Sequence, residues 1–334
     1  MPGLRIDAGR NLGWLDIGSY ARRGPGRRDH LNPGQVELIV RTVRRTPEVM
    51  VKMLNRGGQD VRAVARHLKY LDRNGELEIE TDEGTRLRGQ GTEKEIIDDW
   101  DLGIDESRGG INLGPRGRPA PKLVQKILFS MPPGTPPDKV LAAVKDFARE
   151  EFALKHRYAM VLHTDEPHPH VHLVVKALGD DGKRLNIRRA TLRTWRAEFA
   201  THLRAHGIMA NATDRTVRGV TKPQKTDGIY RAAARGQSTH WRERVQAALR
   251  MRTTEGHSQK EPVKRRLLET HGAVVRGWRE IAKDLERADQ NSLADAVRRY
   301  ANTLPLPRAE SEYIYAQIRR SQKDQRGRRE VPER

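Results

Sequence analysis

The chain of 334 residues contains no cysteine, which excludes disulfides, thiolate catalysis and cysteine-bound zinc. It also lacks any run near the roughly 18 apolar residues of a membrane-spanning helix, so we expect no membrane insertion. The N-terminus MPGLRIDAGRN has no apolar segment behind its basic residue and does not predict a secretory signal. We therefore expect a soluble, cytoplasmic protein.

Acidic residues are too few to balance the basic ones. Asp and Glu number 44 against 64 Lys and Arg, a formal net charge of +20. A cationic surplus of this size attracts a polyanion, and nucleic-acid phosphate is the usual one. Apolar content is only 36%, so part of the chain should be a solvated arm or open helix instead of core.

The length indicates about two domains. Residues 1–35 are rich in Gly, Pro and Arg and predict a flexible basic arm. Order is expected from Val36, where VELIVRTV is β-rich in composition, while residues 103–121 predict a Gly/Pro-rich loop. We expect a catalytic domain at 36–220 and a helical, basic C-terminal region at 221–334 that ends in a disordered tail.

Strand and helix patterns alternate along the middle of the chain. Apolar residues recur at helical spacing from Val61 to Leu71, and Asn74-Gly75 ends that run. Strands are predicted for ELEIET, KLVQKILFS, RYAMVLH and VHLVVKAL. Hairpin-connected strands with helices on one face indicate an α+β fold. We expect a central antiparallel sheet with helices packed on it, followed by a mainly helical C-terminal region.

Four of the twelve histidines lie within HTDEPHPHVHLVV. Side chains alternate faces along a strand, so His163 shares a face with Val161. On the following strand His170 and His172 share one face, and Val171 points the other way, into the core. If the two strands are antiparallel neighbours, three imidazoles converge.

Three imidazoles leave coordination positions open for water or phosphate oxygen, as a catalytic metal requires. By themselves they would suggest zinc. Asp165 follows two residues after His163 and could accept a ring N–H from one ligand. His168 is in the turn, where we expect it to orient a ligand or contact substrate, not to bind the metal.

A side-chain nucleophile would have to be Ser, Thr or Tyr, since cysteine is absent. Tyr70 lies on the predicted helix just off its apolar stripe. Its neighbours on that helix are basic: Arg66, Lys69 and Arg73. Basic neighbours bind phosphate and lower the pKa of a phenol. Spacing ranks Tyr70 first and Tyr230, at the start of a plausible helix, second; either could be an ordinary core-edge tyrosine.

Three segments resemble motifs of the conjugative relaxases of the HUH endonuclease superfamily. HTDEPHPHVHLVV resembles the histidine motif, HLKYLDRNGELEIE the tyrosine segment and LFSMPPGTPPDKV the serine segment. The branch that they resemble most contains the plasmid mobilisation and T-DNA border-nicking relaxases. The resemblance covers roughly residues 36–220, with the motifs in the family's order.

The resemblance implies that Tyr70 attacks a phosphodiester of single-stranded DNA at an origin of transfer. The products would be a 5′-phosphotyrosine bond and a free 3′-hydroxyl. It also implies that three histidines hold Mg²⁺ or Mn²⁺, with zinc still a candidate: His163, His170 and His172.

Further roles follow from the same resemblance. Asp165 would be catalytic, either tuning a histidine or accepting the phenolic proton, and Ser130 would position DNA beside the nick. Arg66 and His168 are expected to contact DNA. Accessory relaxosome proteins and the coupling ATPase of a type IV secretion system are the expected protein partners. The protein would act in conjugative transfer of a plasmid or mobile element and could be exported with its covalently bound DNA.

Three alternatives stay open. A histidine-triad nucleotide hydrolase would use His170 as nucleophile and no metal, although Pro169 stands where such a motif has an apolar strand residue. A rolling-circle replication initiator would use Tyr230. A non-catalytic DNA-binding protein would bind phosphate through its basic segments and keep a structural metal.

Overall fold

The computed structural model describes six parts of the chain: residues 31–54, 58–110, 121–220, 238–253, 262–316 and 318. Most of the predicted N-terminal arm, Tyr230 and the predicted C-terminal tail lie outside these residues. By their contacts the described residues form two compact units. The first lies within 44–212, and the second joins 31–43 to the residues from 213 onward. The units describe packing and not function, so the catalytic domain at 36–220 stays a prediction.

The first unit is built on a six-stranded sheet in which neighbouring strands are antiparallel. In spatial order its strands are β1 (Met50–Met53), β4 (Val124–Ser130), β6 (His170–Lys176), β5 (Tyr158–His163), β2 (Ile79–Thr81) and β3 (Arg86–Leu87). The described helices of this unit are α3 (Val61–Leu71), α4 (Thr92–Asp99), α5 (Leu102–Gly110), α6 (Pro137–Phe152) and α7 (Arg189–Ala205). The predicted α+β fold on a central antiparallel sheet is confirmed.

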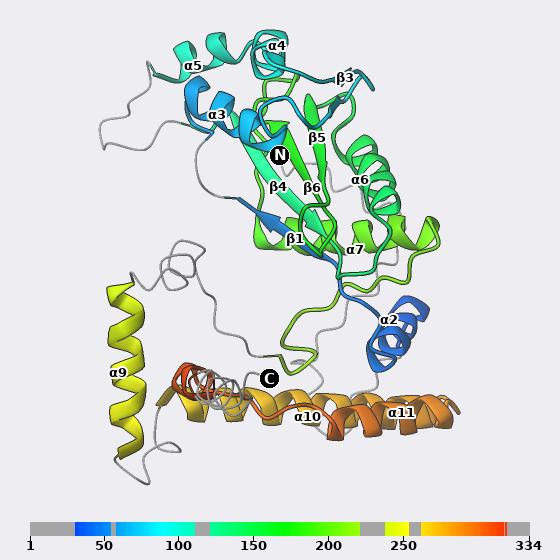
Figure 1. Ribbon diagram of the computed structural model, residues 1–334. Coiled ribbons are helices and arrows are strands. Elements are labelled where there is room, and N and C mark those ends of the chain that lie inside the picture. The colour runs from blue at the N-terminus through cyan, green and yellow to red at the C-terminus, as the bar shows by residue number, and fades with distance from the viewer. Residues whose placement is uncertain are drawn as a thin grey trace, which may run out of the picture. The chain divides into compact units, whose positions relative to one another are not determined.

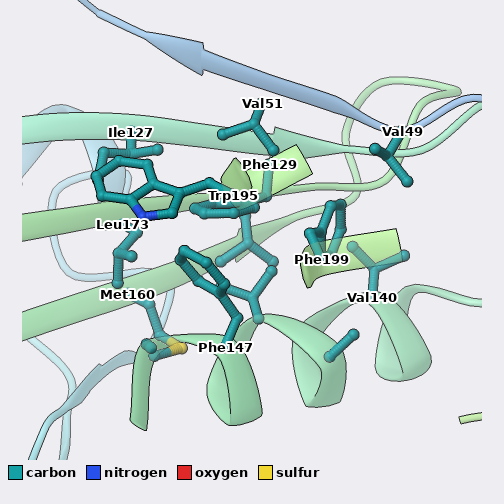
Figure 2. Packing of buried hydrophobic residues seen from close by; sticks show 14 of the residues in the cluster. Val49, Val51, Ile127, Phe129, Val140, Phe147, Met160, Leu173, Trp195 and Phe199 are labelled. Carbon is teal, nitrogen blue, oxygen red and sulfur yellow. The ribbon is translucent and has the colours of Figure 1, made fainter. Parts of the chain in front are cut away.

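One face of the sheet, called here the back face, is closed by α6 and α7 over an apolar core. The ring of Phe147 lies 4.9 Å from that of Phe129 and 5.8 Å from that of Trp195, measured between centroids. Figure 2 shows Phe147, Trp195 and Phe199 gathered over the strand residues Phe129 and Leu173. Dense aromatic packing of this kind gives the sheet a rigid support.

The opposite face, called here the histidine face, is covered in part by α3 and α4. Apolar side chains from both helices, and Trp100 just after α4, pack on alternate strand residues. They include Val64, Leu68 and Ile96, which share a core with Val124, Val161 and Val174. Figure 1 shows α3 and α6 on opposite sides of β4 and β6. The prediction that helices cover only one face was therefore wrong. The apolar stripe of α3 and the valines on this face of the sheet both need burial, and they bury each other.

The segment VELIVRTV is helical, not strand-like as its β-rich composition predicted. It lies in α2 (Pro33–Val43). The backbone N–H of Gln35 donates to Asn32 Oδ1 at 2.8 Å, and the N–H of Asn32 donates to Gln35 Oε1 at 3.0 Å. This reciprocal cap starts the helix. Its buried residues follow helical spacing: Leu38, Ile39 and Thr42.

The predicted loop at 103–121 was also wrong in its first part, because α5 occupies residues 102–110 and only 111–120 lie outside the described residues. The Asp101 carbonyl accepts the first helical N–H groups, and Leu102 is fully buried. Glu106 accepts the N–H of Val61 at 3.2 Å. Tertiary contacts thus stabilise a helix whose glycines disfavour it.

The second unit is helical, as expected for the C-terminal region. Its described helices include α2, α9 (Thr239–Thr253), α10 (Pro262–Arg287) and α11 (Asn291–Asn302). Trp278 lies in the core shared by α2, α10 and α11 and donates from Nε1 to the Val217 carbonyl at 2.8 Å. None of the helices described for this chain combines the length and the apolar composition needed to cross a membrane.

Candidate active site

Three histidines converge on the histidine face, as strand parity predicted. In the β5–β6 hairpin, His163 pairs with His170 and Val161 pairs with His172, so all three rings lie on one face. Their ring centroids are 4.8–5.3 Å apart. One nitrogen from each ring lies within 4.8 Å of the other two. Val171, on the other face, is fully buried in the back-face core.

Backbone carbonyls fix the protonation of two of these rings. A carbonyl can only accept, so the ring nitrogen facing it must carry the proton. His163 donates from Nε2 to the Leu71 carbonyl at 2.7 Å, which leaves its Nδ1 with the lone pair. His170 donates from Nδ1 to the His168 carbonyl at 2.9 Å, which leaves its Nε2 free. Such carbonyl contacts orient histidine ligands in metal sites.

The third ring has a buried nitrogen without a partner. Nδ1 of His172 is buried and makes no hydrogen bond within the part of the chain that the structure describes. Burial, with the neighbouring His163 and His170, lowers the pKa of His172 to about 3. Burial likewise lowers the pKa of His163. Neutral imidazoles with available lone pairs are what a cation requires.

These residues fit a divalent metal. At about 2.0–2.1 Å per bond, two nitrogens on one ion lie at most about 4.2 Å apart. The three ring nitrogens lie within 4.8 Å of one another, which is slightly wider. A small inward movement of the rings would therefore bring them to bonding distance of one ion. Three nitrogens occupy one side of an ion and leave the other side for oxygen ligands.

Helix α3 brings Tyr70 to this face. Asp60 caps the helix by accepting the N–H of Ala63 at 2.7 Å. Leu68 and Leu71 anchor the helix in the core, while Tyr70, off that stripe, has 53% of its surface exposed. The helix ends at Leu71, whose carbonyl accepts the hydrogen bond from His163. The accessible phenol and the histidines thus belong to one packed unit.

Two side chains link Tyr70 to the histidines. The guanidinium carbon of Arg73 lies 5.0 Å from the centroid of the Tyr70 ring, and its Nη2 lies 3.5 Å from His163 Nδ1. The His67 ring stacks on Tyr70 with centroids 6.4 Å apart and meets the His172 ring edge-on at the same distance. Candidates separated by 93 positions in sequence (163 − 70) therefore share one site.

Asp165 lies at the edge of the site and pairs with Arg73. Its Oδ2 is 2.5 Å from Arg73 Nη2. Burial acts to raise the pKa of Asp165, but the hydrogen bond and charge of Arg73 outweigh it and lower that pKa. The carboxylate is therefore held by a guanidinium. Its expected action on a histidine or on the phenolic proton stays a prediction.

The predicted DNA contacts are near the histidines or near α3. Ser130 is buried at the end of β4 and pairs in register with His170. His168 is exposed in the hairpin turn, and Arg66 is exposed on α3. Lys69, the other basic neighbour, pairs with Glu93 on α4 at 2.9 Å. The structure places these residues, and their roles stay predictions.

Two residues of the site had not been singled out from the sequence. His67 is three residues before Tyr70 on the same helical face, and burial, with Lys126 and His163, lowers its pKa to about 4. Lys126 on β4 is only 4% exposed. The spacing of HLKY could have indicated His67, because residues three apart are neighbours on a helix. A cation within a strand carries no comparable signal.

A family model described as relaxase, MobA/VirD2-like, nuclease domain, matches residues 92–208. The matched segment includes β4, α6, the β5–β6 hairpin and α7, and with them the three histidines. Tyr70 and α3 precede it. The match therefore includes the three histidines of the candidate active site but not Tyr70.

Relatives named T-DNA border endonuclease VirD2 are similar over a longer stretch. The protein from Agrobacterium fabrum is 26% identical over 204 residues, 57% of this chain and 45% of that relative. The one from Rhizobium radiobacter is 26% identical over 213 residues, 57% of this chain and 47% of the relative. The chain thus spans about half the length of the curated relatives that it matches.

A solved structure described as "Molecular Basis of Vancomycin Resistance Transfer in Staphylococcus aureus" aligns with 51% of this chain and 99% of its own at 14% identity. Its TM-score of 0.31 is too low to support a conclusion about the fold. The family match and the curated relatives are consistent with the histidine geometry. Residues 92–208 are similar to the MobA/VirD2-like relaxase nuclease domain, and the longer similarity to the VirD2 relatives includes them.

Proposed function

We propose that the protein is a DNA relaxase that nicks single-stranded DNA at an origin of transfer, with Tyr70 as its nucleophile. One observation carries the proposal: the end of α3 meets the histidine strands. The Leu71 carbonyl accepts a hydrogen bond from His163. Arg73 contacts the Tyr70 ring, and its Nη2 approaches His163 Nδ1. An exposed phenol beside a three-histidine cluster suits attack on a phosphodiester.

His163, His170 and His172 would hold a divalent ion, for which we propose Mg²⁺ or Mn²⁺ and keep Zn²⁺ as a candidate. When bound, such an ion supplies Lewis-acid polarisation of a phosphate oxygen. The chain's own contribution is to hold the imidazoles neutral and oriented by the carbonyls of Leu71 and His168.

The proposed chemistry is a transesterification at phosphorus. As the bond between Tyr70 Oη and phosphorus forms, the bond from phosphorus to the 3′-oxygen of the preceding nucleotide breaks. The phenolic proton passes to a base, for which we propose Asp165, and the departing 3′-oxygen takes up a proton from solvent. One ester replaces another, so the reverse reaction can rejoin the strand without ATP.

We further propose that Ser130, Arg66 and His168 position the DNA strand. Ser130 neighbours His170 in the sheet register, His168 is exposed in the hairpin turn and Arg66 is exposed on α3. A single strand suits a site of this kind because its phosphates could reach the histidine cluster while its bases contact the surrounding surface. Residues 36–220 would form the catalytic domain.

The biological setting is part of the proposal. The protein would act in transfer of a plasmid or mobile element, with accessory relaxosome proteins and the coupling ATPase of a type IV secretion system as partners. We propose the helical region 221–334 for these contacts or for additional DNA binding. It would act in the cytoplasm and could be exported with its covalently bound DNA.

The decisive experiment captures a covalent adduct from a random pool of single-stranded oligonucleotides. The full chain is incubated with the pool in Mg²⁺ or Mn²⁺, and adducts are isolated on a denaturing gel and sequenced. Mass spectrometry then identifies the modified residue. We expect an enriched sequence motif and phosphorylation of Tyr70. A random pool removes the need to know the origin sequence beforehand.

Matched Tyr→Phe variants locate the nucleophile. Tyr70→Phe removes one hydroxyl from an exposed ring and should abolish the adduct with little change in stability. Tyr230→Phe should leave the adduct intact. The opposite result would favour a rolling-circle initiator with Tyr230 as nucleophile.

Metal removal separates the remaining alternatives. We expect EDTA to abolish adduct formation and Mn²⁺ to restore it. Activity on nucleotides that survives chelation in full would favour a histidine-triad hydrolase acting through His170. Binding of the pool without any adduct, in any of the three metals, would favour a non-catalytic DNA-binding protein.

A further inference from the structure

The turn after α3 holds the backbone of Arg73 in a left-handed conformation. Arg73 and Asn74 have left-handed backbone conformations, with φ of +55° and +59°, and Gly75 follows with φ of +92°. A Cβ on Gly75 would lie 2.5 Å from the carbonyl carbon of Gly89, so this position accepts only glycine. Non-glycine residues in this region are strained and cluster at functional sites.

The turn is also anchored from within. Asp72 is only 1% exposed, and its carbonyl accepts the N–H of Gly75 at 3.1 Å and that of Leu77 at 2.8 Å. The conformation therefore directs the next side chain, that of Arg73, in a defined direction.

Arg73 contacts the proposed nucleophile, the proposed base and one of the three histidines. Its guanidinium lies against the Tyr70 ring, and its Nη2 pairs with Asp165 and approaches His163 Nδ1. Its Nη1 also donates a hydrogen bond to the backbone carbonyl of Tyr70 at 3.4 Å. The Arg73 side chain nevertheless keeps 30% of its surface exposed and is open to a ligand.

The geometry of the reaction puts the scissile phosphate beside this guanidinium. The phosphate must reach Tyr70 for attack and the histidine cluster for polarisation, and Arg73 lies between the two. A guanidinium presents a planar fork of donors that matches two oxygens of a carboxylate or of a phosphate. In the free protein the half-exposed Asp165 pairs with one nitrogen of that fork, Nη2.

We propose that Arg73 is a catalytic residue that exchanges the Asp165 carboxylate for the scissile phosphate and stabilises the charge on its non-bridging oxygens during attack. This inference rests on the proposed function. Charge on those oxygens grows toward the transition state, and a fixed donor aimed at it is worth about 10²–10³-fold in rate. The strained turn keeps the donor fixed.

The test compares two substrates and two arginine variants. The oligonucleotide selected by adduct capture is made with either a phosphodiester or an uncharged methylphosphonate at the scissile linkage. Single-turnover adduct formation is measured for the wild-type chain, Arg73→Gln and Arg73→Lys. On the phosphodiester we expect Arg73→Gln to lose about 10²–10³-fold, and Arg73→Lys to lose less because it keeps the charge but not the fork. On the methylphosphonate the Arg73→Gln loss should shrink to a few-fold.

A second measurement excludes collapse of the metal site. Mn²⁺ binding is followed by electron paramagnetic resonance without DNA. Arg73→Gln should bind Mn²⁺ at least as tightly as the wild-type chain, because a positive charge near His163 is removed. His163→Ala, the matched control, should weaken binding at least tenfold. Weaker Mn²⁺ binding by Arg73→Gln would overturn the inference, since Arg73 would then support the histidine site.

The kinetic outcomes are distinct. An equal Arg73→Gln loss on both substrates would overturn the inference, since Arg73 would act on Tyr70 or on folding and not on phosphate charge. An unchanged rate for Arg73→Gln would overturn it as well, while leaving the proposed function intact. Absence of an adduct with the wild-type chain would instead overturn the proposed function, and this inference with it.

Discussion

The two faces of the central sheet are made by the same strands, but they contain different chemistry. On the back face, Phe129 and Leu173 meet α6 and α7 in a core that is apolar throughout. On the histidine face, the valines under α3 and α4 give way to His163, His170, His172 and Lys126. Alternation along a strand allows one backbone to provide both surfaces.

The contrast separates stability from chemistry. The back face is packed with apolar side chains. On the histidine face, two buried polar atoms have no hydrogen-bond partner among the described residues: Nδ1 of His172 and Nε2 of His67. An unpaired buried polar atom destabilises the free protein by roughly 1–3 kcal/mol. A rigid back face can offset that cost and hold the rings in place for a ligand.

The largest stability effect is expected on the back face. Phe147→Ala removes a ring that is 1% exposed and packs on Phe129, Phe152 and Trp195. The loss should be about 3–5 kcal/mol in free energy of unfolding, measured by urea denaturation. Leu154→Ala, at a fully exposed position on the turn after α6, should change it by less than about 0.5 kcal/mol. A small loss for Phe147→Ala would show that the back face is not the main support.

Much of this two-faced design could be predicted from the sequence. Strand parity alone placed His163, His170 and His172 on one face and Val171 on the other. These predictions depend on the two-residue period of a strand, which is local and exact. The off-stripe position of Tyr70 was local in the same way, since it followed from the period of one helix.

What could not be predicted depends on how elements meet. VELIVRTV is β-rich in composition, yet the Asn32 cap and burial of Leu38 against other helices make it helical. The presence of α3 on the histidine face, and so the approach of Arg73 to His163, needs the tertiary packing of Leu68 and Leu71. No local period encodes a contact across 90 residues.

Lys126→Met should make the histidine face more like the back face and should stabilise the protein. Burial, with Lys122 and Arg66, lowers the pKa of Lys126 from 10.5 to about 8 in the folded chain. Below pH 8 the residue is charged in both states, so the full cost of burial is present. The cost fades between pH 8 and 10.5 as only the unfolded chain keeps the proton.

We therefore expect Lys126→Met to add up to about 3 kcal/mol at pH 7 and almost nothing at pH 10.5, by urea denaturation at both pH values. Lys139→Met, at an exposed position on α6, is the matched control and should stay within about 0.5 kcal/mol. A destabilised Lys126→Met chain would mean that the contacts of this cation in the folded chain outweigh the cost of its burial.

The next largest effect is a loss of stability in acid, through His172 on the histidine face. The folded pKa of His172 is about 3, below its ordinary value of 6.5, so the unfolded chain binds the proton first as pH falls. Stability is fully present above pH 6.5 and is lost progressively between pH 6.5 and 3. In EDTA, the wild-type chain should lose roughly 2 kcal/mol through His172 between pH 7.5 and 5. His172→Gln should reduce that slope, while His168→Gln, exposed in the turn, should not; equal slopes in all three chains would refute the assignment.

The smallest effect is expected where the histidine face is most open. The pair of Arg73 and Asp165 joins the end of α3 to the β5–β6 hairpin, but the Asp165 side chain is 53% exposed. Exposed ion pairs contribute about 0–1 kcal/mol, because solvent screens them. A double-mutant cycle with Arg73→Gln and Asp165→Asn, measured by urea denaturation, should therefore give a coupling below about 1 kcal/mol. A coupling of 2 kcal/mol or more would mean that the pair is a structural clasp between helix and hairpin. A small coupling would mean that a contact this close adds little to folding, and Arg73 would then be free to leave Asp165 for a phosphate at little cost.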